Sequence, residues 1–291
     1  MATATATLAI TALKASGTRA TTARSGPALV LAQGWVPRWR RASLATVPAM
    51  TYVLIHGGGS TGRFWDRVVP RLDGPALAVD LPGRGNKPVD LTTLTVDDEV
   101  ASVVGDIEAT HPDGPITLVA HSSGGLVVPG VAGRLGGRVT RIVLNAALVP
   151  EEGGCGLDCM QPRHRDGLAL AVEQARLDSA AITLPGPPAD RESFRRAYGG
   201  DPLSDADLDF VVAPDRCVAD TVHHYFQPVH WSLAAAIPVT YILNDPDRPV
   251  PVASHEEMLH RLPGPTTVVR LDGGHIPAVT QPERLAREIV G

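Results

Sequence analysis

The chain has 291 residues, of which 44% are hydrophobic and 20% are charged, and its formal net charge is −5. This composition is typical of a globular protein with one large core, and the negative charge excludes the basic surface that nucleic acids and anionic membranes require. Three cysteines are too few for a disulfide framework, so we expect a cytoplasmic location. The motifs described below, and not the composition, indicate a small-molecule substrate as the partner. The composition specifies no oligomeric state.

The first 49 residues differ in composition from the rest of the chain. They carry six basic residues and no acidic one, since Asp66 is the first acidic residue. Two interpretations stay open: a start codon placed upstream of Met50, which we favour, or a transit-like leader for organelle import. On either interpretation, residues 1–49 lie outside the fold and residues 50–291 form the domain.

Short apolar runs alternate with longer helical patterns from Met50 onward. Six runs have strand length and strand composition: 51–55, 76–80, 116–120, 141–145, 239–243 and 267–271. Helices are expected at about 63–72, 96–110, 124–136, 253–262 and 281–290. Thr95 and Asp98 form a near capping box at the start of the second of these helices. This order predicts an α/β fold with a doubly wound, mainly parallel sheet.

Residues 146–237 interrupt this alternation. They contain no convincing strand, but they hold helical stretches at about 165–178, 190–198 and 204–212. Ligands of an open α/β sheet bind beyond the carboxyl ends of its strands, so an insertion that leaves such an end can cover the binding crevice. We therefore expect a helical lid.

The strongest local signal follows the third strand, in the sequence LVAHSSGGLVV. A nucleophilic serine needs a sharp strand-to-helix turn with small residues two positions to either side. Ser122 has Ala120 and Gly124 at these positions, whereas Ser123 would have the bulky His121. Ser122 is therefore the candidate nucleophile, and Ser123 supplies the next backbone N–H. A serine that only caps a helix is the structural alternative.

A glycine-rich turn, His56-Gly57-Gly58-Gly59, follows the first strand directly. Its backbone N–H groups can point at a developing oxyanion, beside the N–H that follows the nucleophile. Gly58 is the first candidate for this donor and Gly59 the second. A plain strand-exit turn is the alternative.

His275 lies in the loop after the last strand and is the candidate general base, because the order along the chain should be serine, acid, histidine. The loop after the fifth strand offers two acids, Asp245 and Asp247. The acid must accept the Nδ1 proton of the histidine. Asp247 lies deeper in the loop and is preferred, although Asp245 stays possible.

These motifs resemble those of the α/β-hydrolase superfamily, and the resemblance extends from Met50 to Gly291. The matching pieces are His56-Gly57-Gly58 with Trp65, Asp80-Leu81-Pro82-Gly83-Arg84-Gly85, the turn at Ser122, Asp247-Arg248 and Gly274-His275. The chain is similar in particular to the small esterase branch, which includes plant methylesterases and hydroxynitrile lyases. The resemblance implies a mainly parallel sheet with a helical lid, supports Asp247 as the acid, and implies that no metal or organic cofactor takes part.

Two departures from the family pattern matter. Ala120 stands where glycine is usual, and residues 236–262 contain no lysine, whereas the hydroxynitrile lyases place a lysine near the catalytic acid. Lyase chemistry is therefore disfavoured. We expect a serine hydrolase that cleaves a small carboxylic ester or lactone through an acyl-enzyme. The alternatives are a cofactor-independent lyase or C–C bond hydrolase on the same fold, and a non-catalytic ligand-binding protein.

Aromatic side chains near the predicted strand ends could contact the substrate. Phe64, Trp65 and Trp231 are the candidates, although packing is the more common role of such rings. Cys155, Cys159 and His164 form a C-x3-C-x4-H run, but a second pair of ligands is lacking nearby, so we expect no metal site.

Overall fold

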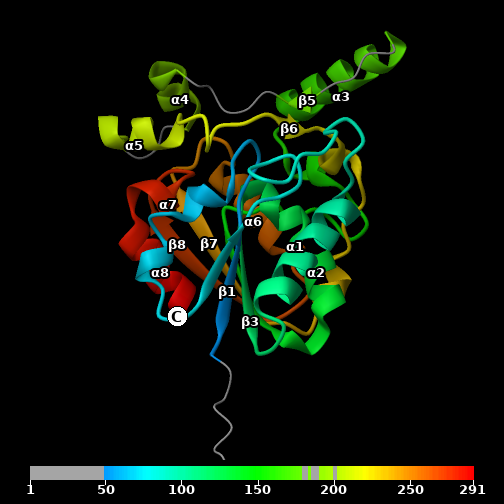
Figure 1. Ribbon diagram of the computed structural model, residues 1–291. Coiled ribbons are helices and arrows are strands. Elements are labelled where there is room, and N and C mark those ends of the chain that lie inside the picture. Colours follow the sequence, from blue (N-terminus) through cyan, green and yellow to red (C-terminus); the bar gives the residue numbers. More distant parts are fainter. Residues whose placement is uncertain (1–48, 179–182, 185–189, 199–201) are drawn as a thin grey trace, which may run out of the picture. The chain divides into compact units, whose positions relative to one another are not determined.

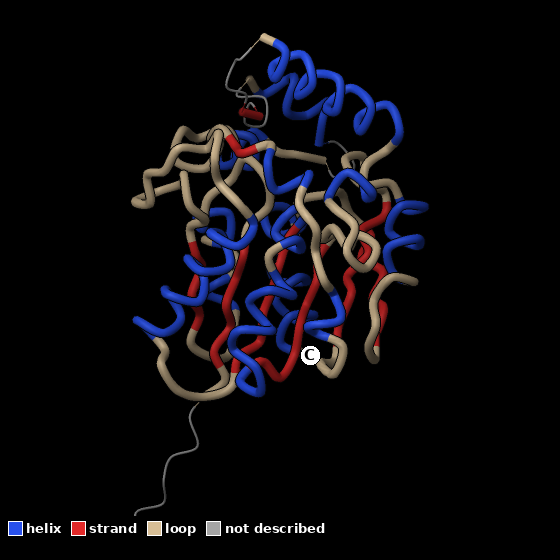
Figure 2. Tube along the Cα trace, turned by 90° about the vertical axis from the view of Figure 1, so that its right-hand side faces the viewer, coloured by secondary structure: helices blue, strands red, loops and turns tan. Residues whose placement is uncertain are grey.

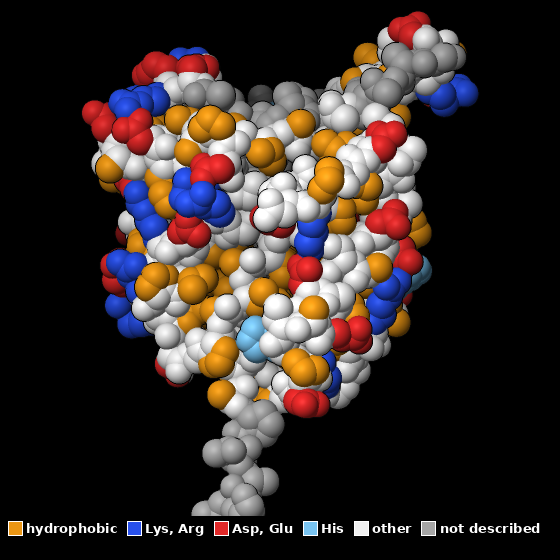
Figure 3. Space-filling view, viewed as in Figure 1, with side chains coloured by type: hydrophobic (Ala, Val, Ile, Leu, Met, Phe, Trp, Pro, Cys, Tyr) orange, Lys and Arg blue, Asp and Glu red, His pale blue; other side chains and the backbone are white. Residues whose placement is uncertain are grey.

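The computed structural model describes residues 49–178, 183–184, 190–198 and 202–291. The predictions for the leader fall on residues 1–48, which lie outside this described part. None of the helices described combines the length and hydrophobicity needed to cross a lipid bilayer. Figure 3 shows acidic and basic side chains interspersed on one face, so charges there compensate one another locally.

Six parallel strands form the central sheet, which Figures 1 and 2 show from two directions. The strands are β1 (Thr51–Ile55), β2 (Ala76–Val79), β3 (Ile116–His121), β4 (Val139–Asn145), β7 (Val239–Asp245) and β8 (Thr266–Asp272). Their order in the sheet is β2-β1-β3-β4-β7-β8, and every neighbouring pair is parallel. The predicted α/β fold with a doubly wound sheet is therefore confirmed.

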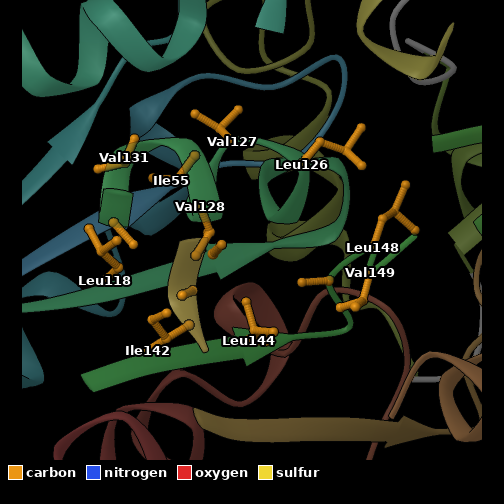
Figure 4. Close-up of a cluster of buried hydrophobic side chains, with 14 of the residues drawn as sticks. Ile55, Leu118, Leu126, Val127, Val128, Val131, Ile142, Leu144, Leu148 and Val149 are labelled. Atoms are coloured by element: carbon orange, nitrogen blue, oxygen red, sulfur yellow. The ribbon is translucent and has the colours of Figure 1, made fainter. Parts of the chain in front are cut away.

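Helices cover both faces of this sheet. They are α1 (Val96–Thr110), α2 (Val128–Leu135), α6 (Val252–Leu259), α7 (Pro277–Thr280) and α8 (Pro282–Val290), with short 3-10 turns at η3 (Ser122–Leu126) and η4 (Gly136–Arg138). Side chains alternate between the faces along each strand. Val53 and Ile55 accordingly pack in the core under α1, α2 and α6, whereas Tyr52 and Leu54 pack in the core under α8. Figure 4 shows part of the first core.

Local sequence explains where α1 begins and why residues 63–72 do not form one helix. The capping box at α1 is confirmed: Thr95 Oγ1 accepts from the Asp98 N–H at 3.1 Å, and Asp98 Oδ2 accepts from the Thr95 N–H at 3.0 Å. The helix predicted at 63–72 is wrong, since two 3-10 turns occupy this stretch, η1 (Gly62–Trp65) and η2 (Val69–Arg71). Pro70 lacks the N–H that a continuous helix needs there.

The insertion between β4 and β7 is helical, as expected. Its elements are η5 (Gly156–Cys159), α3 (Pro162–Leu177), α4 (Arg191–Tyr198), α5 (Asp205–Val211), η6 (His223–Phe226) and η7 (Trp231–Ala234). It also contains a small antiparallel pair that the sequence did not reveal, β5 (Thr183–Leu184) with β6 (Asp220–Thr221). Strands of two residues are too short to display an alternating pattern.

Candidate active site

The candidate site lies where the strand order reverses. β1 pairs with β2 on one side and with β3 on the other, so the chain switches direction between β1 and β3. Crevices at such switch points, beyond the carboxyl ends of the strands, are where ligands bind in this architecture. The register pairs Ile55 with Ala120, which places the glycine-rich turn beside Ser122.

The turn at Ser122 is sharp and sterically demanding. Ser122 has a φ of 51°, a left-handed conformation that is uncommon for residues other than glycine. The turn packs against the exit of β1 so closely that small residues are required. A Cβ on Gly57 would lie 2.8 Å from the Ser122 Cβ, and one on Gly124 would lie 2.6 Å from the His56 carbonyl oxygen. These contacts explain the glycines around the candidate nucleophile.

Ser122, His275 and Asp247 come together as a hydrogen-bonded chain. The Ser122 Oγ lies 3.1 Å from the His275 Nε2, and the His275 Nδ1 lies 2.7 Å from the Asp247 Oδ2. The loops that carry the acid and the histidine meet because Asp245 and Asp272 are paired at the ends of β7 and β8. Asp247 is buried, whereas Asp245 is exposed. Asp247 is thus the carboxylate that contacts the histidine.

Asp247 is held in its charged form. Burial is the largest influence and raises its pKa, but the opposing influences together outweigh burial: the charge of His275, hydrogen bonds from His255 and His275, and the Val250 N–H. The net result is a pKa well below the usual range. A charged carboxylate only accepts hydrogen bonds, so the His275 Nδ1 carries a proton toward it. In its neutral form, the imidazole then presents an unprotonated Nε2 to the Ser122 hydroxyl.

His121 supports the backbone of the candidate base. Burial, followed by the charge of His275, lowers its pKa to about 3, so the ring is neutral near pH 7. Its Nε2 lies 2.8 Å from the His275 carbonyl oxygen, to which it donates. Its ring also stacks on Phe64, with the centroids 4.6 Å apart.

The glycine-rich turn is anchored by the insertion. The Gly59 N–H donates to the Asp220 Oδ2 at 2.8 Å, and the Val218 N–H donates to the Gly59 carbonyl oxygen at 3.0 Å. This contact commits the Gly59 N–H and leaves Gly58 as the stronger candidate for an oxyanion donor. Ser123 is buried beside the turn, and its Oγ would lie 3.2 Å from a Cβ on Gly58. The two residues that carry the candidate donors therefore lie next to each other.

A buried charge cluster fixes Asp220 in turn. Its Oδ1 is paired with the Arg84 guanidinium and also accepts from the Thr221 N–H at 2.7 Å. The Arg84 side chain is fully buried, and its second carboxylate partner is Glu99, 3.4 Å away. A buried cation of this kind is stable only when it is paired. The anchor of the glycine-rich turn is thus part of the core, although Asp220 belongs to the insertion.

A pocket with aromatic walls opens onto Ser122 and His275. Its empty volume is about 490 Å³, which includes the open mouth. Phe64 lies on its wall, as predicted, but Trp65 and Trp231 do not. These two rings are 0% and 1% exposed and pack in the two hydrophobic cores instead. Large apolar rings next to a sheet gain more from complete burial than from lining an open pocket.

Sequence inspection missed the walls that the insertion supplies. Phe194 and Tyr198 of α4 and Phe210 of α5 line the pocket, and the first two rings stack with centroids 4.5 Å apart. A usable signal was present, because Phe194 and Tyr198 stand four residues apart in the otherwise polar helix RESFRRAY. Asp220 carried no comparable signal. Its partners, Gly59 and Arg84, are more than a hundred residues away in the sequence.

Comparison with known proteins places this chain in a family. A pyrethroid hydrolase of Sphingobium wenxiniae is 29% identical over 81% of this chain and 85% of its own length. A pimeloyl-[acyl-carrier protein] methyl ester esterase of Methylococcus capsulatus is 27% identical over 81% of this chain and 92% of its own. Among solved structures, an extracellular α/β-hydrolase from a Paenibacillus species has a TM-score of 0.70 at 22% identity, covering 83% of this chain and 98% of its own. The model of the alpha/beta hydrolase family matches residues 52–288, and the chain belongs to this family.

Proposed function

We propose that this protein is a serine hydrolase that cleaves carboxylic esters through an acyl-enzyme. The observation that carries the proposal is the chain of contacts from the Ser122 Oγ through His275 to the Asp247 carboxylate, at 3.1 and 2.7 Å. A serine hydroxyl is a weak nucleophile unless an adjacent base takes its proton. The contact with Asp247 supports this role for His275, because a charged carboxylate needs a proton on the Nδ1 that faces it.

The reaction proceeds in two steps. His275 takes the Ser122 proton as the Oγ attacks the ester carbonyl, and the Gly58 and Ser123 N–H groups stabilise the oxyanion. The imidazolium gives its proton to the leaving alcohol as the tetrahedral intermediate collapses to the acyl-enzyme. In the second step, the same imidazole takes a proton from water as the water attacks the ester on Ser122, and it returns this proton to the Ser122 Oγ as the acid leaves. Asp247 stays ionised throughout and stabilises the imidazolium.

The pocket favours an ester with an apolar group. Most of its wall is hydrophobic, from Phe64, Phe194, Tyr198, Phe210 and Ile276. Apolar surface removed from water contributes roughly 25 cal/mol per Å², which favours a bulky hydrocarbon over a polar group at this wall. The names of two relatives, a pyrethroid hydrolase and a methyl ester esterase, support ester hydrolysis as the reaction class.

Ser122→Ala tests the proposal directly. We expect turnover of p-nitrophenyl acetate to fall by about a thousandfold or more, because the nucleophile is lost, while circular dichroism shows a folded protein. A fluorophosphonate probe should label the wild type and not Ser122→Ala. Ser123→Ala is the matched control: it removes the neighbouring hydroxyl, keeps the backbone N–H, and should still be labelled. Absence of labelling in the wild type would favour a ligand-binding role instead.

Ester size tests the assignment of the pocket. The ratio of kcat/KM for p-nitrophenyl butyrate to that for p-nitrophenyl acetate should exceed one, because the longer chain buries more apolar surface. Each added methylene contributes about 0.8 kcal/mol when fully buried. Phe194→Ala should lower this ratio, since it removes part of the wall. An unchanged ratio would place the acyl group elsewhere.

A further inference from the structure

A second histidine stands behind the proposed catalytic acid. His255 lies on α6, the helix that follows the acid loop, and its side chain is fully buried. Its Nε2 lies 3.3 Å from the Asp247 Oδ2, the same oxygen that faces His275. Its Nδ1 lies 2.8 Å from the Tyr241 hydroxyl on β7. Both ring nitrogens therefore have polar partners in a site without access to water.

The partners determine where one proton of His255 resides. Asp247 is a carboxylate and can only accept, so the His255 Nε2 carries the proton between them. The Tyr241 hydroxyl has a single proton, which it gives either to the His255 Nδ1 or to the Ala147 carbonyl oxygen, 3.0 Å away. The first arrangement makes His255 neutral and the second makes it an imidazolium. In both, an Nε2–H points at the Asp247 Oδ2.

These contacts restrain a carboxylate that a loop alone would hold loosely. Oδ2 accepts from His275 and His255, and Oδ1 accepts from the Val250 N–H at 2.9 Å. Rotation of the carboxylate breaks all three bonds together. Because His255 is on a helix and Tyr241 on a central strand, the restraint comes from regular secondary structure and not from the loop. Burying an imidazole at this position is costly unless both nitrogens are paired, and here both are.

We propose that His255 is a positioning residue of the active site, which fixes the Asp247 carboxylate so that its Oδ2 faces the His275 Nδ1. This inference rests on the proposed function. His255 acts in two ways. It holds the geometry of the contact between Asp247 and His275, and its N–H withdraws negative charge from the Asp247 carboxylate. The second effect makes Asp247 a weaker partner for the His275 proton. Removing His255 should therefore make His275 easier to protonate.

The groups that face this cluster come from several elements. The titratable side chains nearest to it are Asp247, His275, Tyr241, His121, Tyr198 and Cys159. Burial raises the pKa of Tyr241 well above its ordinary value and the pKa of Tyr198 and Cys159 to about 12, so these three stay protonated near neutral pH. The acidic residues of α6 itself, Glu256 and Glu257, are exposed. These three side chains and the two glutamates therefore do not change charge beside the cluster near neutral pH, and the groups in direct contact with Asp247 are His255 and His275.

His255→Leu and His255→Gln test this role. The leucine variant removes the donor at similar size, whereas the glutamine variant keeps an N–H that can reach Asp247. Per fluorophosphonate-labelled site, His255→Leu should lower kcat for p-nitrophenyl acetate about 10- to 100-fold with KM nearly unchanged, which is the range found when a partner that orients a metal-ligating side chain is removed. The acid limb of kcat/KM should move up by about half a pH unit. His255→Gln should recover most of kcat.

The matched control is His260→Leu, at the exposed end of the same helix, which should match the wild type. Should His255→Leu fail to fold, Tyr241→Phe decides, because it removes the hydroxyl that orients His255 and should also lower kcat. If His255→Leu folds and has the kcat and the acid limb of the wild type, the proposal is overturned. If His255→Leu does not fold, the same result in Tyr241→Phe overturns it. A role in packing alone would lower the yield of folded enzyme but leave both quantities unchanged.

A readout that needs no turnover separates this proposal from the function itself. The His275 Nδ1–H beside Asp247 should give a downfield proton NMR resonance, absent in His275→Gln. His255→Leu should shift or broaden this resonance, and His260→Leu should not. A wild type that neither labels nor hydrolyses esters would refute the serine hydrolase, while the NMR comparison would still test His255. An unshifted resonance in His255→Leu would refute the positioning role alone.

Discussion

The two halves of the site are supported by different parts of the chain. The acid–base half, Asp247 and His275, is held by β7, α6 and the loop after β8, all of which belong to the sheet domain. The oxyanion half, Gly58 and Gly59, leaves β1, but its anchor is Asp220 of the insertion. The insertion therefore does more than line the pocket, because one of its side chains holds the loop that is proposed to stabilise the oxyanion.

The two halves therefore depend on different properties: one on the protonation state of its side chains, the other on the position of a loop. The proposed acid–base half would need a defined protonation state, and the charge of His275 together with the hydrogen bonds to Asp247 outweighs burial and lowers the pKa of this carboxyl. The proposed oxyanion half would need two N–H groups at a fixed distance, and a buried ion pair between Arg84 and Asp220 holds the carboxylate that anchors the Gly59 loop. Substitutions in the first half should change the pH profile. Substitutions in the second should lower kcat without moving the profile.

The largest effect is expected from Asp247→Asn, in the acid–base half. The amide replaces the acceptor of the His275 Nδ1 proton and can stabilise the wrong tautomer, so kcat should fall by about 10,000-fold. Stopped-flow or steady-state assays with p-nitrophenyl acetate measure this. Asp245→Asn is the matched control, since Asp245 is exposed, and its kcat should stay near the wild-type value. Equal losses in both variants would contradict the assignment of the acid.

A smaller effect is expected from Asp220→Ala, in the oxyanion half. The Gly59 N–H loses its acceptor, so the loop loses its anchor and kcat should fall by about 100-fold, close to the effect of removing one oxyanion donor. Because Arg84 also loses a buried partner, the free energy of unfolding should fall by about 3 kcal/mol.

Urea unfolding and the pH profile of kcat/KM check this prediction. The acid limb should stay in place, because the contacts of Asp247 are untouched. Asp209→Asn, which removes an exposed ion pair of the same insertion, is the control and should change neither quantity appreciably. A shifted acid limb in Asp220→Ala would show that the two halves are coupled.

The smallest effect concerns the pH dependence of stability. Each half of the site contains a buried neutral histidine, His56 in the glycine-rich turn and His121 beside His275. Burial, followed by the charge of Arg84, lowers the pKa of His56 to about 3, as burial does for His121. His56 is held in its neutral tautomer, since its Nε2 accepts from the Leu81 N–H at 3.2 Å. The unfolded chain binds the proton near pH 6.5 and the folded chain only near pH 3. Stability is therefore fully present above about pH 6.5 and is lost as the pH falls toward 3.

His56→Gln measures this contribution. Each such histidine adds up to about 1.4 kcal/mol per pH unit to the slope of the free energy of unfolding between these limits. The variant should flatten the slope between pH 6 and pH 4 by that amount, in urea titrations at several pH values. A slope equal to that of the wild type would mean that His56 is protonated in the folded state.

Site residues that directly follow a strand of the sheet were predictable from the sequence. Residues that reach the site from the insertion or from a helix were not. The six strands were placed to within a few residues because buried parallel strands are continuous apolar runs. Ser122, Asp247 and His275 each follow such a strand, so their meeting could be expected from the sheet alone. Whether they perform catalysis stays a prediction until the variants are measured.

The support of the site was hidden for a physical reason. Asp220 and His255 each make polar contacts with residues of other elements, and a single polar contact between distant elements leaves no periodic pattern in the sequence. The two tryptophans were misread for a related reason. A large aromatic ring looks alike in sequence whether it fills a core or lines a pocket, and only its neighbours decide.

The anchoring of Gly59 by Asp220 sets limits on how the insertion can be exchanged. The helices α4 and α5 contribute pocket walls and are natural segments to replace when a different substrate range is wanted. The stretch that holds Val218 and Asp220 belongs functionally with β1, to which it is joined by hydrogen bonds. A chimaera that takes its whole insertion from a relative also exchanges these two hydrogen bonds to Gly59. The junction of such a graft is best placed before residue 217, so that the host keeps the Val218 and Asp220 that bind its own glycine-rich turn.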